Sequence, residues 1–140
     1  MKVNIPVIIF SIAICSLFAV SCRGTAERQL VAAVEDYNRT CPIRMSDIIR
    51  IDSLHLDHAS RDLAFCCTVT DLSRGVFSDT AALQTARDFC ERESRTQIDK
   101  LQSNDYGRET LMLIKRAKTT LSFVYRLDSG DTIDVHTEKI

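Results

Sequence analysis

The four cysteines beyond residue 40 are the side chains of this sequence best suited to covalent chemistry. Cys66 and Cys67 are adjacent, and Cys41 and Cys90 lie on either side of them. Reactive thiols usually lie at the start of a helix, where the dipole and the backbone amides stabilise the thiolate. Because the alternating apolar pattern around Cys66 predicts a strand, the sequence favours structural disulfides over thiol chemistry.

The pairing of these cysteines can be ranked by geometry. Four cysteines allow three complete pairings. Successive side chains of a strand point to opposite faces, so a bridge between Cys66 and Cys67 would distort the peptide that joins them. Cys67 and Cys90 both fall on the apolar faces of their predicted elements, and we expect them to pair, which leaves Cys41 with Cys66. Each bridge would add ~2–4 kcal/mol of stability. The alternative is a thiol-dependent redox protein that uses Cys66 or Cys67 with Cys90.

A group of polar residues at a strand end is the second candidate for chemistry. It consists of His55, Asp57, His58 and Asp62. His55 and Asp57 would share a strand face, and His58 would fold over them to complete a set of nitrogen and oxygen donors. The spacing matches no dedicated metal motif, and a solvated loop has the same composition. We therefore expect neither a metal nor another cofactor, and we interpret His136 as an exposed residue of the last strand.

Other catalytic classes find little support in the sequence. The glycines beyond residue 22 are scattered singly: Gly24, Gly75, Gly107 and Gly130. Neither a nucleophile elbow nor a phosphate-binding loop can be built from single glycines. Carboxylates such as Asp47, Asp52 and Asp57 could in principle pair for glycoside hydrolysis. We interpret them as exposed charges, because a small domain without tryptophan has little material for a sugar-binding cleft. The sequence therefore favours a protein that is not an enzyme.

The first 22 residues predict export and a lipid anchor. Lys2 is followed by an apolar run from Ile5 to Val20, as in a secretory signal. The junction Ala19-Val20-Ser21-Cys22 resembles the lipobox of bacterial lipoproteins, in which the chain is cut before the cysteine and the sulfur is acylated. Ala19 stands where leucine is usual. A retained transmembrane anchor is the alternative, since about 16 to 18 apolar residues approach a bilayer span, but Pro6 and the small residues at the junction favour cleavage.

This interpretation sets the domain boundaries and the compartment. We expect a cleaved signal peptide at 1–21, a lipidated Cys22 with a short tether at 22–25, and a single domain at 26–140. Arg23 follows the cysteine where lipoproteins of the inner membrane typically carry aspartate, which implies the outer membrane, facing the periplasm or the cell surface. Lys2 is the only charged residue before Cys22, so 17 of the 18 basic and all 19 acidic residues remain. With no basic excess and no basic run, nucleic-acid binding is not expected.

Hydrophobic periodicity predicts the element order αββααββ. Helices are expected at about 26–38, 79–103 and 109–117. Strands are expected at 49–56, 63–70, 119–127 and 133–137. A change of phase at Asp52-Ser53 indicates a bulge in the first strand. Two hairpins side by side would give a four-stranded antiparallel sheet with the helices on one face, an α+β fold.

Three segments carry a resemblance to a known group of proteins. Asn38–Ile43, Ile49–Ser53 and Leu121–Gly130, with the lipobox ahead of them, resemble small envelope lipoproteins of Gram-negative gut bacteria. The resemblance implies a location and a fold, and no activity can be carried over from it. We therefore expect a lipid-anchored envelope protein that binds or scaffolds an unidentified envelope component, with the open face of the sheet as the natural binding surface.

Overall fold

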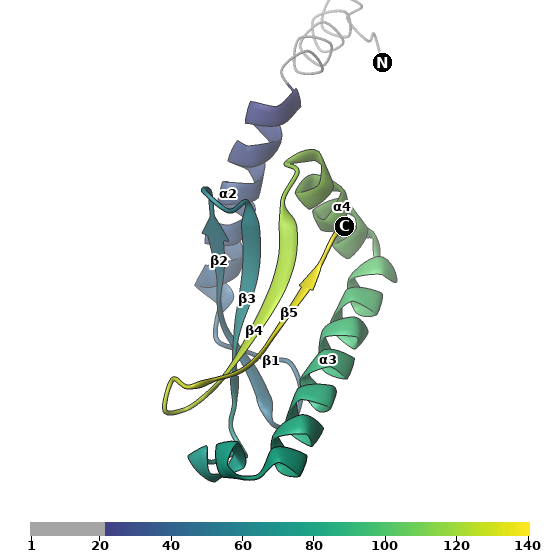
Figure 1. Cartoon of the computed structure of the whole chain (residues 1–140). Helices are drawn as coiled ribbons and strands as arrows, with labels where there is room; N and C mark the ends of the chain where they lie inside the picture. Colours follow the sequence, from purple (N-terminus) through teal and green to yellow (C-terminus); the bar gives the residue numbers. More distant parts are fainter. Residues whose placement is uncertain (1–21) are drawn as a thin grey trace, which may run out of the picture.

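Residues 22–140 form one sheet and a layer of helices in the computed structural model, which describes this part of the chain (Figure 1). The elements are α2 (Cys22–Thr40), β1 (Ile43–Arg44), β2 (Ile49–Asp57), β3 (Asp62–Val69), the 3-10 helix η1 (Arg74–Ser78), α3 (Thr80–Gln102), α4 (Asp105–Arg116), β4 (Thr120–Leu127) and β5 (Thr132–Glu138). The predicted α+β class is confirmed. The predicted signal peptide, 1–21, lies outside the described residues.

The sheet is mixed, with the strand order β1-β2-β3-β4-β5. The two predicted antiparallel hairpins are present, but they meet through a parallel β3–β4 pair in which Asp62 lies beside Thr120 and Val69 beside Leu127. The prediction of four antiparallel strands was therefore wrong in two respects, since β1 adds a fifth strand and the central pair is parallel. The cause is the α3–α4 connection, which returns the chain to the end of the sheet where β3 begins.

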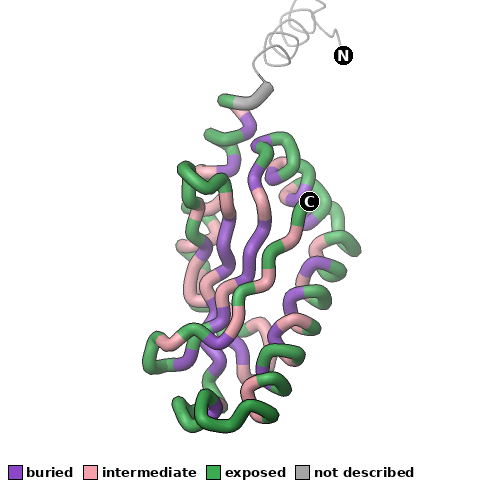
Figure 2. Tube along the Cα trace, in the orientation of Figure 1, coloured by how far each residue is buried: buried purple, intermediate pink, exposed green. Residues whose placement is uncertain are grey.

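The core lies on one face of the sheet. Buried side chains at alternate positions of β3 and β4 point to this face: Leu63, Phe65, Cys67, Val69, Leu121, Phe123, Tyr125 and Leu127. The rings of Phe65 and Phe123 stack with their centroids 4.9 Å apart. Buried residues of all three α-helices complete the same cluster: Leu30, Cys90, Ile98 and Ile114. The helices therefore cover one face, and the buried residues in Figure 2 follow the strands and the inner sides of the helices.

Polar side chains fix the starts of α3 and α4. Asp79 accepts hydrogen bonds from the amides of Ala81 and Ala82 at 3.0 and 3.1 Å, as expected of a cap. Asn104 accepts from the amide of Gly107 at 2.7 Å, so α4 begins earlier than the apolar pattern predicted. α2 also begins earlier, at Cys22, and residues 22–25, expected as a tether, are helical. Among the described residues, no helix combines the length and the hydropathy that a membrane span requires.

The bulge predicted in the first strand is present. The register between β2 and β3 shifts between Ile51 and Ser53. Asp52, at the bulge, accepts hydrogen bonds from Thr68 Oγ1 at 2.5 Å and from Arg50 Nε at 2.6 Å. The change of phase in the apolar pattern thus marks a real irregularity, which turns Ile51 and Leu54 to the same buried face.

Candidate functional site

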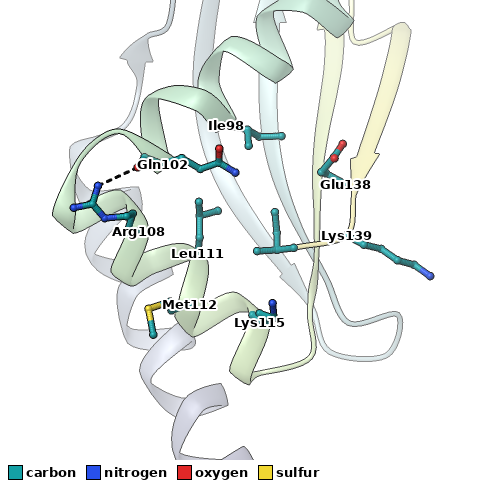
Figure 3. A pocket seen from close by; sticks show the side chains of 9 residues that line it. Ile98, Gln102, Arg108, Leu111, Met112, Lys115, Glu138 and Lys139 are labelled. Atoms are coloured by element: carbon teal, nitrogen blue, oxygen red, sulfur yellow. Dashed lines mark hydrogen bonds between the residues drawn. The ribbon is translucent and has the colours of Figure 1, made fainter.

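A hollow of about 420 Å³ lies where the end of α3, the helix α4 and the end of β5 meet (Figure 3). Nine residues line it: Ile98, Gln102, Arg108, Leu111, Met112, Lys115, Glu138, Lys139 and Ile140. Ile98 and Leu111 are buried and form its apolar floor, whereas Met112 is 52% exposed. Burying these apolar atoms against a ligand would favour binding, because each Å² removed from water contributes ~25 cal/mol.

Charged side chains surround this apolar floor. Arg108 is held in place, because its guanidinium donates to the backbone carbonyl of Gln102 at 3.2 Å. Lys115 and Lys139 are exposed, and neither forms an ion pair with a carboxylate of the described residues. Glu138 lies 3.2 Å from a ring nitrogen of His136. The hollow therefore combines an apolar base with two free cations, a pattern suited to binding rather than to bond-breaking chemistry.

Three of the four thiols beyond residue 40 have a raised pKa: Cys41, Cys67 and Cys90. All four cysteines beyond residue 40 are free in this structure. Cys67 and Cys90 are 2% and 0% exposed, and burial raises the pKa of each to about 12. Burial also raises the pKa of Cys41. Because the thiolate is the reactive form, thiols protonated at neutral pH do not favour the redox alternative.

The two predicted disulfide bridges differ in where the structure places their cysteines. Cys67 and Cys90 belong to the same core cluster, beside Tyr125. Cys41 packs against that cluster, whereas Cys66 alternates with Cys67 along β3 and lies on the open face of the sheet. The structure thus places both members of the first pair in one core cluster, and it separates the members of the second pair between the edge of that cluster and the open face. Both bridges remain predictions.

A buried chain of hydrogen bonds adjoins these thiols, and no motif in the sequence predicted it. The hydroxyls of Ser94 and Tyr125 lie 2.7 Å apart, and Ser94 also donates to the backbone carbonyl of Cys90 at 3.0 Å. Both side chains are 0% exposed, and burial raises the pKa of Tyr125. Ser94 lies midway between Cys90 and Ile98 at helical spacing, which is the sequence signal that would have placed it in the core.

The polar group His55, Asp57, His58 and Asp62, whose first three members were the weak metal candidates, does not converge. Within residues 22–140 no group of three or more potential ligands comes together. The carboxylate of Asp57 accepts from the amides at positions 59 and 60, and these hydrogen bonds lower its pKa. His58 Nδ1 lies 3.0 Å from Glu27 Oε1 of α2. These residues therefore order a turn and tie it to α2.

The open face of the sheet carries small polar side chains that satisfy one another. Asp62 accepts from the hydroxyls of Thr120 and Ser122, each at 2.7 Å, and Ser122 lies 2.9 Å from Thr137 Oγ1. Ser122 is only 2% exposed although no helix covers it, and Val135 is the one large apolar residue of this face that is more than half exposed. A partner on this face would find little apolar area, so the hollow beside α4 is the better candidate for binding.

The chain belongs to the family described as a domain of unknown function, DUF8479, which it matches over residues 25–132. No curated protein matches the sequence. Three solved structures share the fold. A secreted protein from Pseudomonas aeruginosa has a TM-score of 0.57 at 10% identity. The match covers 84% of this chain and 91% of that chain.

The other two structures are pilotins. The type II secretion system pilotin AspS from Vibrio cholerae has a TM-score of 0.57 at 8% identity, with 87% of this chain and 95% of that chain covered. The pilotin EpsS from the Vibrio vulnificus type 2 secretion system has a TM-score of 0.50 at 15% identity, with 81% and 91% covered. At these identities the likeness shows a common fold, which extends over nearly the whole of each protein.

Proposed function

We propose that this member of the family is a lipid-anchored protein of the cell envelope that binds another envelope component and performs no chemistry on it. The observation that carries the proposal is the fold that it shares with pilotins of two type II secretion systems. The arrangement of the site supports it, because the hollow offers apolar area and cations while the most buried thiols are held in the protonated state.

The position of Cys22 supports anchoring. Cys22 is a residue of α2, and Ala26, only one helical turn later, is already 3% exposed in the core. Acyl chains on Cys22 would therefore hold the domain close to the bilayer with little flexible chain between them. A diacylated and N-acylated cysteine supplies more than the two signals that stable anchoring needs, at ~0.8 kcal/mol per buried methylene.

The surface of α4 is our candidate for the docking site. Tyr106 and Met112 are 71% and 52% exposed, and Met112 lines the hollow. Methionine adapts to different partners and exposed tyrosine gives contact area at low cost in entropy, so both are typical of binding surfaces.

Anchoring is tested by labelling cells with a palmitate analogue. We expect Cys22→Ser to lose the label and to block removal of the signal peptide. Cys15→Ser, inside the predicted signal, is the matched control and should label and mature normally. Equal labelling of the Cys22→Ser variant would refute the anchor.

Partner binding is tested by photo-crosslinking in living cells. A photoreactive residue in place of Met112 should give one discrete adduct with an envelope protein, whereas the same residue in place of Gln84, exposed on α3, should give none. Adducts of equal yield at both positions, or none at Met112, would contradict docking at α4.

A further inference from the structure

Four segments that are distant in sequence meet at one end of the domain, which we call the anchor end (Figure 1). They are residues 24–28 of α2, 57–62 around the β2–β3 turn, 115–120 between α4 and β4, and 138–140 at the end of β5. His58 lies 3.0 Å from Glu27, which joins the turn to α2. The amide of Thr120 donates to the carbonyl of Arg61 at 2.9 Å, and β5 ends beside the start of β4.

The anchor end presents six exposed basic side chains: Arg28, Arg61, Lys115, Arg116, Lys118 and Lys139. None of the six forms an ion pair within the part of the chain that the structure describes, whereas five other arginines do. The acidic residues of this end are engaged by other groups. Glu27 and Glu138 contact histidines, and Asp57 and Asp62 accept from backbone amides and hydroxyls. The six cations are therefore free to meet an external anion.

The charge of the domain is unevenly distributed. The anchor end holds six basic and four acidic residues, whereas the rest of residues 24–140 holds ten basic and fifteen acidic residues. An anionic surface would therefore attract the anchor end and repel the net charge of the rest of the domain. This asymmetry orients the domain before any specific contact forms.

Two of these cations occupy backbone positions that suit other residues better. Arg61 and Lys118 have φ angles of 54° and 52°, in the left-handed region. Lys118 follows the C-cap of α4, where glycine is the usual residue. The chain thus presents long cationic side chains at two places where the backbone favours a residue without Cβ.

We propose that the anchor end is a docking surface for the anionic phospholipid headgroups of the membrane that holds Cys22. This inference rests on the lipid anchor of the proposed function. Acylation of Cys22, which begins the helix at this end, would bring the six cations to the bilayer, and lysine and arginine close to an anionic surface each strengthen binding roughly fivefold. Docking would hold the domain upright, with its opposite end directed away from the membrane.

The experiment uses the full chain purified from its membrane fraction. The protein is reconstituted in vesicles of phosphatidylcholine and in vesicles of phosphatidylcholine with phosphatidylglycerol, and amide hydrogen exchange is followed by mass spectrometry. We expect slower exchange at 57–62 and 115–120 in the anionic vesicles only, with η1 unchanged. High salt should remove the protection, because the Debye length shortens from about 10 Å at 0.1 M to about 3 Å at 1 M ionic strength.

Two triple variants provide the comparison. In Lys115→Glu with Arg116→Glu and Lys118→Glu the protection should disappear. The matched control changes the same total charge at exposed positions elsewhere: Arg44→Glu with Arg92→Glu and Arg126→Glu. It should keep the protection, and thermal unfolding verifies that both variants fold.

Equal exchange in the two kinds of vesicle, or equal loss of protection in both triple variants, would overturn the docking surface. The intact mass separates this result from failure of the anchor. If the purified chain carries no acyl groups, the same chain is sedimented with the same vesicles. Binding to anionic vesicles that falls roughly tenfold or more in the anchor-end variant would then support the surface without the anchor, and no binding would refute both.

Discussion

Gly107→Ala tests whether α3 and α4 pack as closely as the structure indicates. A Cβ at position 107 would collide with the carbonyl oxygen of Leu101 and would lie 2.6 Å from its Cα. Both atoms belong to the backbone at the end of α3, so no rotamer change can relieve the contact. Overpacking costs ~1–3 kcal/mol, and a rigid backbone neighbour places this case near the upper limit.

The expected magnitude follows from two opposing effects. Alanine gains ~1 kcal/mol over glycine in a helix, so the net loss in the free energy of unfolding should be ~2 kcal/mol. In a domain of this size each kcal/mol shifts the Tm by ~3–5 °C, which predicts a Tm lower by ~6–10 °C. Thermal and urea unfolding, followed by circular dichroism, measure both quantities.

Gly24→Ala is the matched control, because a Cβ at that helical position meets nothing within 4 Å. It should leave the Tm unchanged or raise it slightly. If Gly107→Ala changed the Tm by less than ~2 °C, the close α3–α4 corner, and with it the placement of the hollow, would be refuted.

Three further predictions concern the core and the anchor end. Tyr125→Phe should cost ~1 kcal/mol in urea unfolding, because Ser94 keeps its bond to a backbone carbonyl, and a loss above ~3 kcal/mol would contradict this. Burial raises the pKa of Cys67 and Cys90 from 9.0 to about 12. The stability that these protonated thiols give the reduced protein should therefore be complete below pH ~9 and be lost as the pH rises through ~12. An unfolding free energy that does not change over this pH range would argue that these thiols are not buried. Lys118→Gly should raise the free energy of unfolding by ~1 kcal/mol while weakening contact with anionic vesicles, and unchanged or lower stability would contradict a strained backbone at this position.

Local patterns predicted most of the elements because each pattern has a local cause. The alternation at Leu121, Phe123 and Tyr125 reflects a strand with one buried face, and the change of phase at Asp52 reflects a bulge. Asp79 was recognised as a cap because its carboxylate meets the free amides at the start of α3.

The pairing of strands could not be predicted in the same way. Nothing in the periodicity of β3 or β4 encodes which strand lies beside it, so the parallel pair depends on the path taken by α3 and α4. β1 has two residues, too few for any pattern. Strand pairing and sheet topology depend on the whole chain, so only the structure shows them.

The candidate sites show the same contrast between features with a local sequence pattern and features that distant segments form together. The sequence placed Cys67 and Cys90 on apolar faces, and both are buried in the core. It identified neither the hollow beside α4 nor the basic anchor end, because each is assembled from segments that are far apart in the chain. A search for local basic runs cannot detect a surface to which four segments each contribute one to three cations.

The intact mass of the protein taken from its native membrane fraction tests the lipid anchor directly. We expect a chain that begins at Cys22 and carries the mass of its acyl groups on that residue. A chain that retains residues 1–21, or one that begins at Cys22 without acyl groups, would contradict a lipid-anchored envelope protein.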